Sequence, residues 1–363
     1  MKTTDMYALN LDQCKNLIQS VGHKRTVLVQ GPMGNGKSSM LWDIAEETGL
    51  TPVYFDATTK DLGDITIPNI SKLDDGTGFV TYLTNEELGV HIDKPIALMI
   101  DEYGKANPAV KNALLRLMLE RKIGSYTLHP DSVIFATTNL GSEGLGDVVP
   151  PHARNRIIVV KLRNVSSREF IEYGINHNLH PAVLSFSKDY PQIFQSYEEV
   201  SDPDENPYIN HPRAADRLAC TTPRSMHAAS DLLWMREHMD DMTLTAALIG
   251  TIGERGATDL MAYVRMLDQL PTLESIKTDP MGAKVPTSPA AVCMVVYRTM
   301  GALDNSWVDA WMDYMPRLDA EAQGMFANGV KDEKYSKRAM VMNNRKFTDW
   351  ARQNNYMFAA DKV

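Results

Sequence analysis

The strongest pattern in the sequence is Thr26-Val27-Leu28-Val29-Gln30-Gly31-Pro32-Met33-Gly34-Asn35-Gly36-Lys37-Ser38-Ser39. Its apolar run Val27–Val29 predicts a short buried strand, and the apolar spacing of Ser38–Glu47 predicts a helix directly after the loop. The glycines, the lysine and the serine of the loop fit G-x-x-x-x-G-K-[ST]. A strand, a glycine-rich loop and a helix in this order predict the start of a sheet with a ligand site at its edge.

The loop has the composition of a phosphate-binding site. Glycines let backbone N–H groups curve around phosphate oxygens, the Lys37 ammonium reaches β- and γ-phosphates, and the Ser38 hydroxyl can bind Mg²⁺. The start of the following helix adds N–H donors and the positive end of its dipole. We therefore expect a nucleoside triphosphate with Mg²⁺ to bind at Gly31, Pro32, Met33, Gly34, Asn35, Gly36, Lys37, Ser38 and Ser39. A chance match in a turn is the alternative, and the predicted flanking strand and helix disfavour it.

A second apolar run, Pro95–Ile100, ends in two adjacent carboxylates, Asp101 and Glu102. Asp101 is expected to complete the Mg²⁺ shell, as the acidic partner of the phosphate loop does in P-loop enzymes. Glu102 is expected to orient or deprotonate the attacking water as a general base. A solvated acidic turn is the alternative, but the phosphate loop upstream favours the catalytic interpretation.

Strands alternate with helices along the first part of the chain. The further strand candidates are Pro52–Asp56, Val133–Asn139 and Ile157–Val160. This alternation predicts an α/β fold with a mostly parallel sheet and helices on both faces. Ligands of such sheets bind at the carboxyl ends of the strands, where Gly31, Asp101 and Asn139 lie.

The remaining segments predict an inserted hairpin and a long helical region. Ile65–Ile70 and Gly78–Leu83 alternate in polarity around a glycine-containing turn, which predicts a β-hairpin, and Pro68 makes it an exposed one. From Asn164 onward the pattern is helical, apart from a polar loop or surface excursion at Asp189–Pro212 and a proline-punctuated linker at Thr278–Pro289. We expect an α/β core over residues 1–163 with the hairpin at about 64–84, a helical region over 164–277 and a helical extension over 278–363.

The composition of the chain indicates a soluble protein of a reducing compartment. The 363 residues carry a formal net charge of −9, and 44% of them are hydrophobic, which is ordinary for a soluble globular protein. The three scattered cysteines fit a reducing compartment better than a disulfide framework. Residues 1–20 lack the apolar core of a signal peptide, and no apolar run reaches membrane-spanning length. We expect a cytoplasmic protein without membrane contact, and its acidity weakly disfavours general nucleic-acid binding.

Together these motifs resemble those of AAA+ ATPases, and within them the MoxR-like branch of bacterial or phage type. Residues 31–38 match Walker A, Ile96–Glu102 matches Walker B, and Asn139 at a strand tip matches sensor 1. The hairpin resembles the helix-2 insert of that branch, and the resemblance covers about residues 10–280. Further matches are Arg154 and Arg156 at the arginine-finger position and Arg224, in Thr222-Pro223-Arg224, at the sensor 2 position.

The resemblance implies a homo-oligomeric ring, usually a hexamer, with ATP and Mg²⁺ between neighbouring subunits. Arg156 and Arg154 would come from the neighbour, Arg224 would contact the nucleotide of its own subunit, and Asn139 would help place the water. Ile157 follows Arg156 where the family usually has an aromatic residue, so the choice between the two fingers stays open. The helical region over 164–277 would be the lid that moves against the core.

Three functions are compatible with these residues. The resemblance favours remodelling or activation of a protein client, commonly with a partner that carries a von Willebrand factor A-type domain. Phe79 and Tyr82 of the hairpin could contact such a client or pack onto their own subunit. A nucleic-acid-directed motor of phage replication, defence or processing is the alternative, because basic residues in Lys331–Arg338 and Arg345-Lys346 could contact phosphates or form a solvated helix face. A nucleotide-gated scaffold with little turnover is the third, and the Asp101-Glu102 pair disfavours it.

Overall fold

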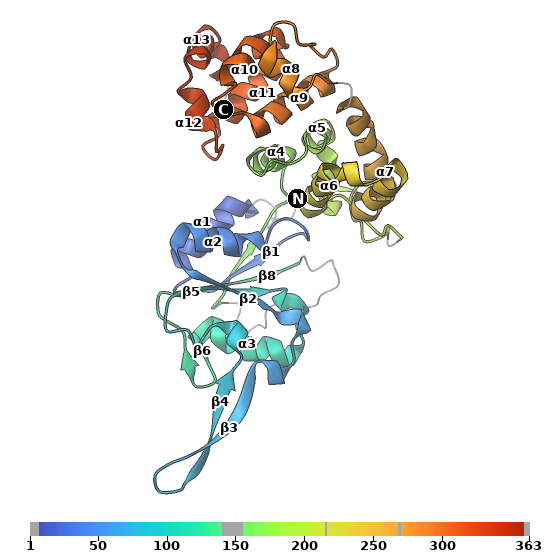
Figure 1. Cartoon of the computed structure of the whole chain (residues 1–363). Coiled ribbons are helices and arrows are strands. Elements are labelled where there is room, and N and C mark those ends of the chain that lie inside the picture. Colours follow the sequence, from blue (N-terminus) through green and yellow to red (C-terminus); the bar gives the residue numbers. More distant parts are fainter. Residues whose placement is uncertain (1–6, 140–154, 215, 268–269, 359–363) are drawn as a thin grey trace. The chain divides into compact units, whose positions relative to one another are not determined.

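The structure is a computed structural model of the chain, and it describes residues 7–139, 155–214, 216–267 and 270–358 (Figure 1). The chain divides into two compact units, residues 1–164 and 165–363. The division of the helical part into a lid and an extension stays a prediction. None of the described helices is long and apolar enough to cross a membrane.

The first unit is built on a five-stranded, wholly parallel sheet with the order β2-β5-β8-β1-β9. Its strands are β1 (Val27–Gln30), β2 (Thr51–Asp56), β5 (Ile96–Asp101), β8 (Val133–Thr138) and β9 (Ile158–Lys161). Every residue of β5 and β8 is buried, as expected for inner parallel strands covered on both faces. The predicted α/β class with a parallel sheet is confirmed.

Helices cover both faces of this sheet (Figure 1). On one face, α1 (Leu11–Val21) and α2 (Ser39–Thr48) pack their apolar side chains against β1, β5 and β8. On the other face, α3 (Pro108–Glu120) buries Val110 and Leu114 with apolar residues of the same strands. The ends of α1 and α3 follow from local sequence, since Asn10 and Asn107 accept backbone N–H groups as N-caps.

Small elements complete the first unit. The predicted hairpin is present as β3 (Thr66–Lys72) and β4 (Gly78–Thr84), which project away from the sheet (Figure 1). Most of its side chains are exposed on both faces, as Pro68 predicted. The other short elements are β6 (Lys122–Ile123), β7 (Tyr126–Thr127), η2 (Ala57–Thr59), η3 (Leu62–Asp64), η4 (Glu86–Leu88) and η5 (Tyr103–Lys105).

The described residues of the second unit form helices joined by irregular segments, without a strand. Its α-helices are α4 (Ser167–Asn176), α5 (Pro181–Asp189), α6 (Pro223–Trp234), α7 (Asp241–Leu267), α8 (Leu273–Thr278), α9 (Pro289–Ala302), α10 (Val308–Tyr314), α11 (Ala320–Lys331), α12 (Arg338–Met342) and α13 (Arg345–Gln353). The 3₁₀ helices of this unit are η8 (Pro191–Phe194), η9 (Tyr197–Glu199), η10 (Pro203–Glu205), η11 (Arg236–His238), η12 (Met315–Arg317) and η13 (Asn355–Phe358).

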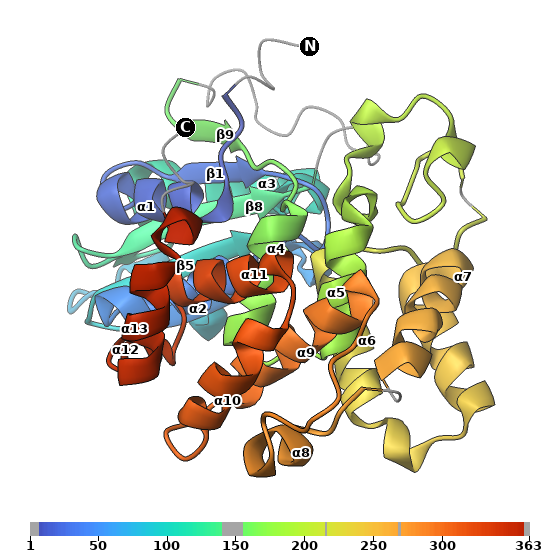
Figure 2. The ribbon, with the colours of Figure 1, turned by 90° about the horizontal axis from the view of Figure 1, so that it is seen from above.

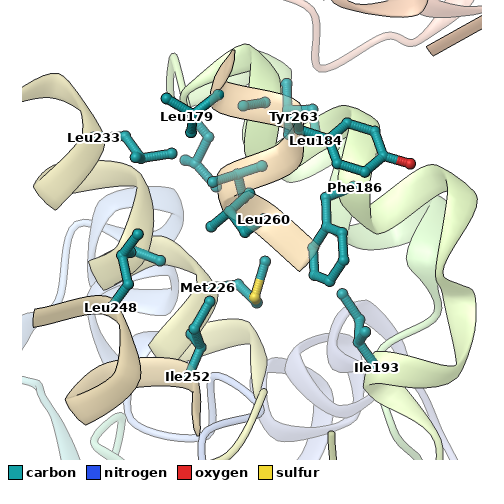
Figure 3. Packing of buried hydrophobic residues seen from close by; sticks show 14 of the residues in the cluster. Leu179, Leu184, Phe186, Ile193, Met226, Leu233, Leu248, Ile252, Leu260 and Tyr263 are labelled. Carbon is teal, nitrogen blue, oxygen red and sulfur yellow. The ribbon is translucent and has the colours of Figure 1, made fainter. Parts of the chain in front are cut away.

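Two apolar clusters form the core of the second unit. The first lies between α4, α5, α6 and α7, and Figure 3 shows Phe186, Met226 and Leu260 converging in it. The second lies among α8 to α13. Helix α9, which packs against α5 (Figure 2), contributes Met294 to the first cluster and Val296 to the second. The two clusters are therefore joined through one shared helix.

One prediction for this unit was wrong in part. Asp189–Pro212 is irregular, as expected, but it is not a surface excursion, because Ile193, Phe194 and Tyr208 are buried in the first cluster. Ile193 and Phe194 are adjacent and Tyr208 follows only after a polar stretch, so the segment shows no apolar period. Their burial explains why the chain folds the segment into three short 3₁₀ turns instead of leaving it in solvent.

Candidate nucleotide-binding site

The loop between β1 and α2 begins in close contact with the sheet. The Gly31 N–H donates to the Thr138 carbonyl oxygen at 3.1 Å. A Cβ atom on Gly31 would lie 2.7 Å from Leu162 Cβ, a distance that real Cβ atoms essentially never show. Gly31 is therefore needed for packing as well as for the curvature of the loop.

Positive φ angles turn the loop back toward α2. Gly34 has φ +72° and Gly36 has φ +78°, a region that side-chain-bearing residues rarely adopt. Between them, the buried Asn35 places its amide nitrogen 3.4 Å from the Arg163 carbonyl oxygen. The Ser39 hydroxyl donates to the Gly36 carbonyl oxygen at 2.7 Å, which closes the turn at the first residue of the helix.

Lys37 connects this loop with the tip of β8. Its buried Nζ donates to the carbonyl oxygens of Gly31 and Pro32, each at 2.8 Å, and to Asn139 Oδ1 at 2.8 Å. The contact with Asn139 joins two side chains 102 residues apart in the sequence. The ammonium group thus lies inside the loop, where a phosphate-binding cation is required.

Asp101 lies at the centre of the polar network. Its Oδ2 accepts from the Ser38 hydroxyl at 3.1 Å and from the Tyr54 hydroxyl at 2.9 Å. Its Oδ1 accepts from the Thr137 hydroxyl and, at 3.1 Å, from the Glu102 N–H. Four donors therefore satisfy a carboxylate that is only 7% exposed, as burial of an ionised group requires.

Tyr54 and Thr137 are site residues that the sequence analysis missed. Burial and, next, the charge of Asp101 raise the pKa of Tyr54, so its phenol stays protonated and acts as a donor. Thr137 is fully buried at the penultimate position of β8. In the sequence, Tyr54 and Thr137 are recognisable only as polar residues near the carboxyl end of a strand. That position does not identify Asp101 as their hydrogen-bond partner.

Glu102 follows Asp101 in a left-handed backbone conformation, with φ +50° and ψ +34°. Such a conformation costs a residue with a side chain about 1 kcal/mol or more and is enriched at active sites. Its Oε2 lies 3.2 Å from Lys105 Nζ in an ion pair of partly exposed side chains. The turn directs the chain away from the sheet immediately after Asp101, with the Glu102 carboxylate at the same edge.

Among the described residues of the first unit, the network of Lys37, Ser38, Asp101 and Asn139 contains no arginine side chain. Arg156 is exposed just before β9, and Arg154 lies outside the described residues. Arg224 belongs to the second unit, where it is exposed in the first turn of α6 after the N-cap Thr222. The first unit alone therefore brings together Lys37, Ser38, Asp101, Glu102 and Asn139.

The donor set fits a magnesium nucleotide. A serine hydroxyl beside a carboxylate supplies hard oxygen ligands, and Mg²⁺ commonly takes its other ligands from substrate phosphates and water. Among the described residues there is no group of three or more His, Cys, Asp or Glu side chains placed to hold a metal. Ser38 and Asp101 are thus the residues that would hold Mg²⁺, and the loop with Lys37 would hold the phosphates.

No protein-family model matches the chain, and no curated protein matches it. Among solved structures, the Thermotoga maritima RuvB Holliday junction branch migration motor is similar, with 15% sequence identity and a TM-score of 0.37 over 87% of this chain and 93% of that one. A mutant of RuvB from the same organism has 13% identity with the same TM-score and coverage. With similarity this low, the functional proposal rests on the site residues themselves.

Proposed function

We propose that the chain is an AAA+ ATPase that hydrolyses ATP to ADP and phosphate with Mg²⁺. The observation that carries this proposal is the convergence of three strand ends on one edge of the parallel sheet. Lys37 after β1 contacts Asn139 after β8 at 2.8 Å, and Ser38 contacts Asp101 of β5 at 3.1 Å. Phosphate loop, metal ligands and candidate base are thus within one network.

The site residues have distinct chemical roles in this proposal. The loop N–H groups and Lys37 would bind the phosphates, and Ser38 and Asp101 would hold Mg²⁺, which would supply charge neutralisation for phosphoryl transfer. Glu102 accepts the proton of the attacking water, and Asn139 orients that water. Lys37 leaves its contacts with the Gly31 and Pro32 carbonyl oxygens when a phosphate offers it a charged partner.

The proposed assembly is a homo-oligomeric ring, hexameric by resemblance, with ATP at each interface. Arg156 is exposed in the isolated chain, which supports its contact with the nucleotide of a neighbour. Arginine fingers supplied in this way contribute about 10³–10⁵-fold to the rate in related phosphoryl-transfer enzymes. Arg154 is the second candidate finger, and Arg224 is proposed as the arginine that contacts the nucleotide from its own chain.

The proposed biological role is remodelling or activation of a protein client, as in MoxR-like ATPases with a von Willebrand factor A-type partner. The projecting hairpin supports it, because Phe79 is 42% and Tyr82 47% exposed. Exposed aromatic side chains on a projecting element are suited to contact another chain. The alternative that these rings pack fully onto their own subunit has less support.

The contacts of the C-terminal basic residues give the nucleic-acid alternative less support than the protein-client role. Lys337 Nζ donates to the carbonyl oxygens of Met300 and Gly301, and Lys346 forms an ion pair with Asp313 at 2.6 Å. Side chains engaged in this way are poor candidates for a phosphate-tracking surface, which needs clustered free cations. A protein client is therefore the favoured substrate.

Two variants test the catalytic proposal. Lys37→Ala is expected to weaken ATP binding about 10- to 100-fold, because it removes a charged hydrogen-bond donor. Glu102→Gln is expected to bind ATP normally while turnover falls about 10²–10⁴-fold, because the general base is lost. Calorimetric ATP binding and phosphate release measure the two effects, and Glu46→Gln, at an exposed position of α2, is the matched control. Wild-type turnover by Glu102→Gln would exclude Glu102 as the base.

The client is identified with the same variant. Glu102→Gln loaded with ATP should retain its client, so a pull-down should recover one protein in fixed ratio that is absent with Lys37→Ala. Nuclease-sensitive nucleic acid in place of a protein would overturn the preference for a protein client. Repetition at rising salt separates the two outcomes further, because nucleic-acid contacts weaken steeply with salt.

A further inference from the structure

The Tyr54 hydroxyl reaches the same carboxylate oxygen as the Ser38 hydroxyl. Tyr54 donates to Asp101 Oδ2 at 2.9 Å, and Ser38 donates to that oxygen at 3.1 Å. The other oxygen, Oδ1, accepts from Thr137 of β8 and from the Glu102 N–H. The two oxygens of Asp101 therefore have different partners: Oδ1 is fixed by the neighbouring strand and backbone, and Oδ2 faces the phosphate loop.

The register of β2 on β5 explains how Tyr54 arrives at this position. Tyr54 pairs with Met99, and Asp56 pairs with Asp101. Residues two apart on a strand project to the same face, and directly paired residues of neighbouring strands share a face. Tyr54 is thus on the face of Asp101, one two-residue step before it, and the length of the tyrosine side chain spans that step.

Tyr54 contributes little to the apolar core. It is 43% exposed on β2, one of the two edge strands of the sheet, whereas its neighbours Val53 and Phe55 are buried on the opposite face. Removal of the hydroxyl alone would leave the ring in place at this edge. Such a change alters the hydrogen bonding of Asp101 far more than it alters packing.

We propose that Tyr54 is a positioning residue for the magnesium site: its hydroxyl orients Asp101 so that Oδ2 faces the Ser38 hydroxyl. Hydrogen-bond partners of metal-binding side chains orient those ligands, and their loss typically lowers metal affinity or activity 10- to 100-fold. The inference rests on the proposed function, because it requires a magnesium nucleotide at the loop.

The test uses Tyr54→Phe in the full chain, with Mn²⁺ as a paramagnetic substitute for Mg²⁺ and a non-hydrolysable ATP analogue. We expect the apparent Kd of protein-bound Mn²⁺, measured by electron paramagnetic resonance, to rise about 10- to 100-fold. Binding of the same analogue in EDTA should match the wild type. Tyr356→Phe, which removes a hydroxyl from an exposed tyrosine of η13, should leave both measurements unchanged.

Kinetics distinguish positioning from a merely structural role. Tyr54→Phe should need more Mg²⁺ for half-maximal ATP hydrolysis and should regain the wild-type kcat at saturating Mg²⁺. A lower kcat at every Mg²⁺ concentration, or an Mn²⁺ affinity equal to that of a wild type that binds the analogue, would overturn the inference. If the wild type binds the analogue no better than Lys37→Ala does, the proposed function fails and the inference fails with it.

Discussion

Gly31 is the residue at which the phosphate loop and the sheet approach each other most closely. A methyl group there would lie 2.7 Å from Leu162 Cβ, so Gly31→Ala must displace the loop or the segment after β9. We expect a loss of about 1–3 kcal/mol in the free energy of unfolding, together with weaker ATP binding. Urea unfolding and calorimetry measure the two effects.

Gly63→Ala is the matched control, because no atom lies within 4 Å of the added methyl group. It should change the free energy of unfolding by no more than about 0.5 kcal/mol and leave ATP binding unchanged. Equal unfolding midpoints for Gly31→Ala and the wild type would mean that the loop accommodates the methyl group without displacement.

For the individual residues of the site, the sequence predicts which of them lie at the same edge of the sheet, but not which atoms form hydrogen bonds. Lys37 and Asn139 both follow strands, and the rule for carboxyl ends is enough to place them together. Tyr54 could not be assigned, because its contact with Asp101 depends on β2 lying beside β5 in one particular register. Strand order and register are tertiary properties that a local pattern does not contain.

Among the elements, α7 (Asp241–Leu267) contains a break that depends on a single glycine. Gly253 has φ +80° and ψ +163°, and a Cβ there would lie 2.7 Å from the Ala219 carbonyl oxygen. Gly253→Ala should therefore lower the free energy of unfolding by about 2–4 kcal/mol, through backbone strain and the steric clash. Thermal and urea unfolding of the full chain provide the measurement.

Gly250 of the same helix provides a control for which the expected change in the free energy of unfolding has the opposite sign. No atom lies within 4 Å of a Cβ added there, and the residue is exposed and helical. Gly250→Ala should raise the free energy of unfolding by about 0.5–1 kcal/mol, because alanine favours the helix and restricts the unfolded chain. The same sign for both variants would contradict a special role for the break at Gly253.

Two helices of the region that was predicted to be helical lack a regular sequence pattern of their own. Residues 181–187 of α5 are all buried, so that helix has no polar face and no amphipathic period to detect. Helix α11 contains Gly324 and Gly329, which a sequence pattern treats as helix breakers. A Cβ on Gly329 would lie 2.2 Å from Met300 Cε, the end of a flexible side chain on α9, so the Met300 side chain would have to shift if residue 329 carried a Cβ. The α/β core was predictable because its inner strands are short, continuous apolar runs that alternate with amphipathic helical segments.

For the molecule as a whole, the proposed chemistry needs residues from two chains. Lys37, Asp101 and Glu102 lie in one network of the first unit, whereas Arg156 is exposed before β9. A finger that acts in trans would restore activity when two differently defective subunits meet at one interface. We therefore predict that Arg156→Ala and Glu102→Gln, each nearly inactive alone, regain ATP hydrolysis when mixed.

The statistics of subunit mixing set how much ATP hydrolysis the mixture can recover. In a ring with random mixing at equal amounts, about one quarter of the interfaces pair an intact Glu102 with an intact Arg156 from the neighbour. The mixture should therefore reach up to about one quarter of the wild-type rate, measured as phosphate release after subunit exchange. Lys37→Ala mixed with Glu102→Gln is the control, because both defects affect the nucleotide site of a single subunit and no intact interface can form. Arg154→Ala in place of Arg156→Ala tests the second candidate finger. If neither arginine variant, mixed with Glu102→Gln, hydrolyses ATP faster than the sum of the two separate variants, a finger in trans is excluded at both positions.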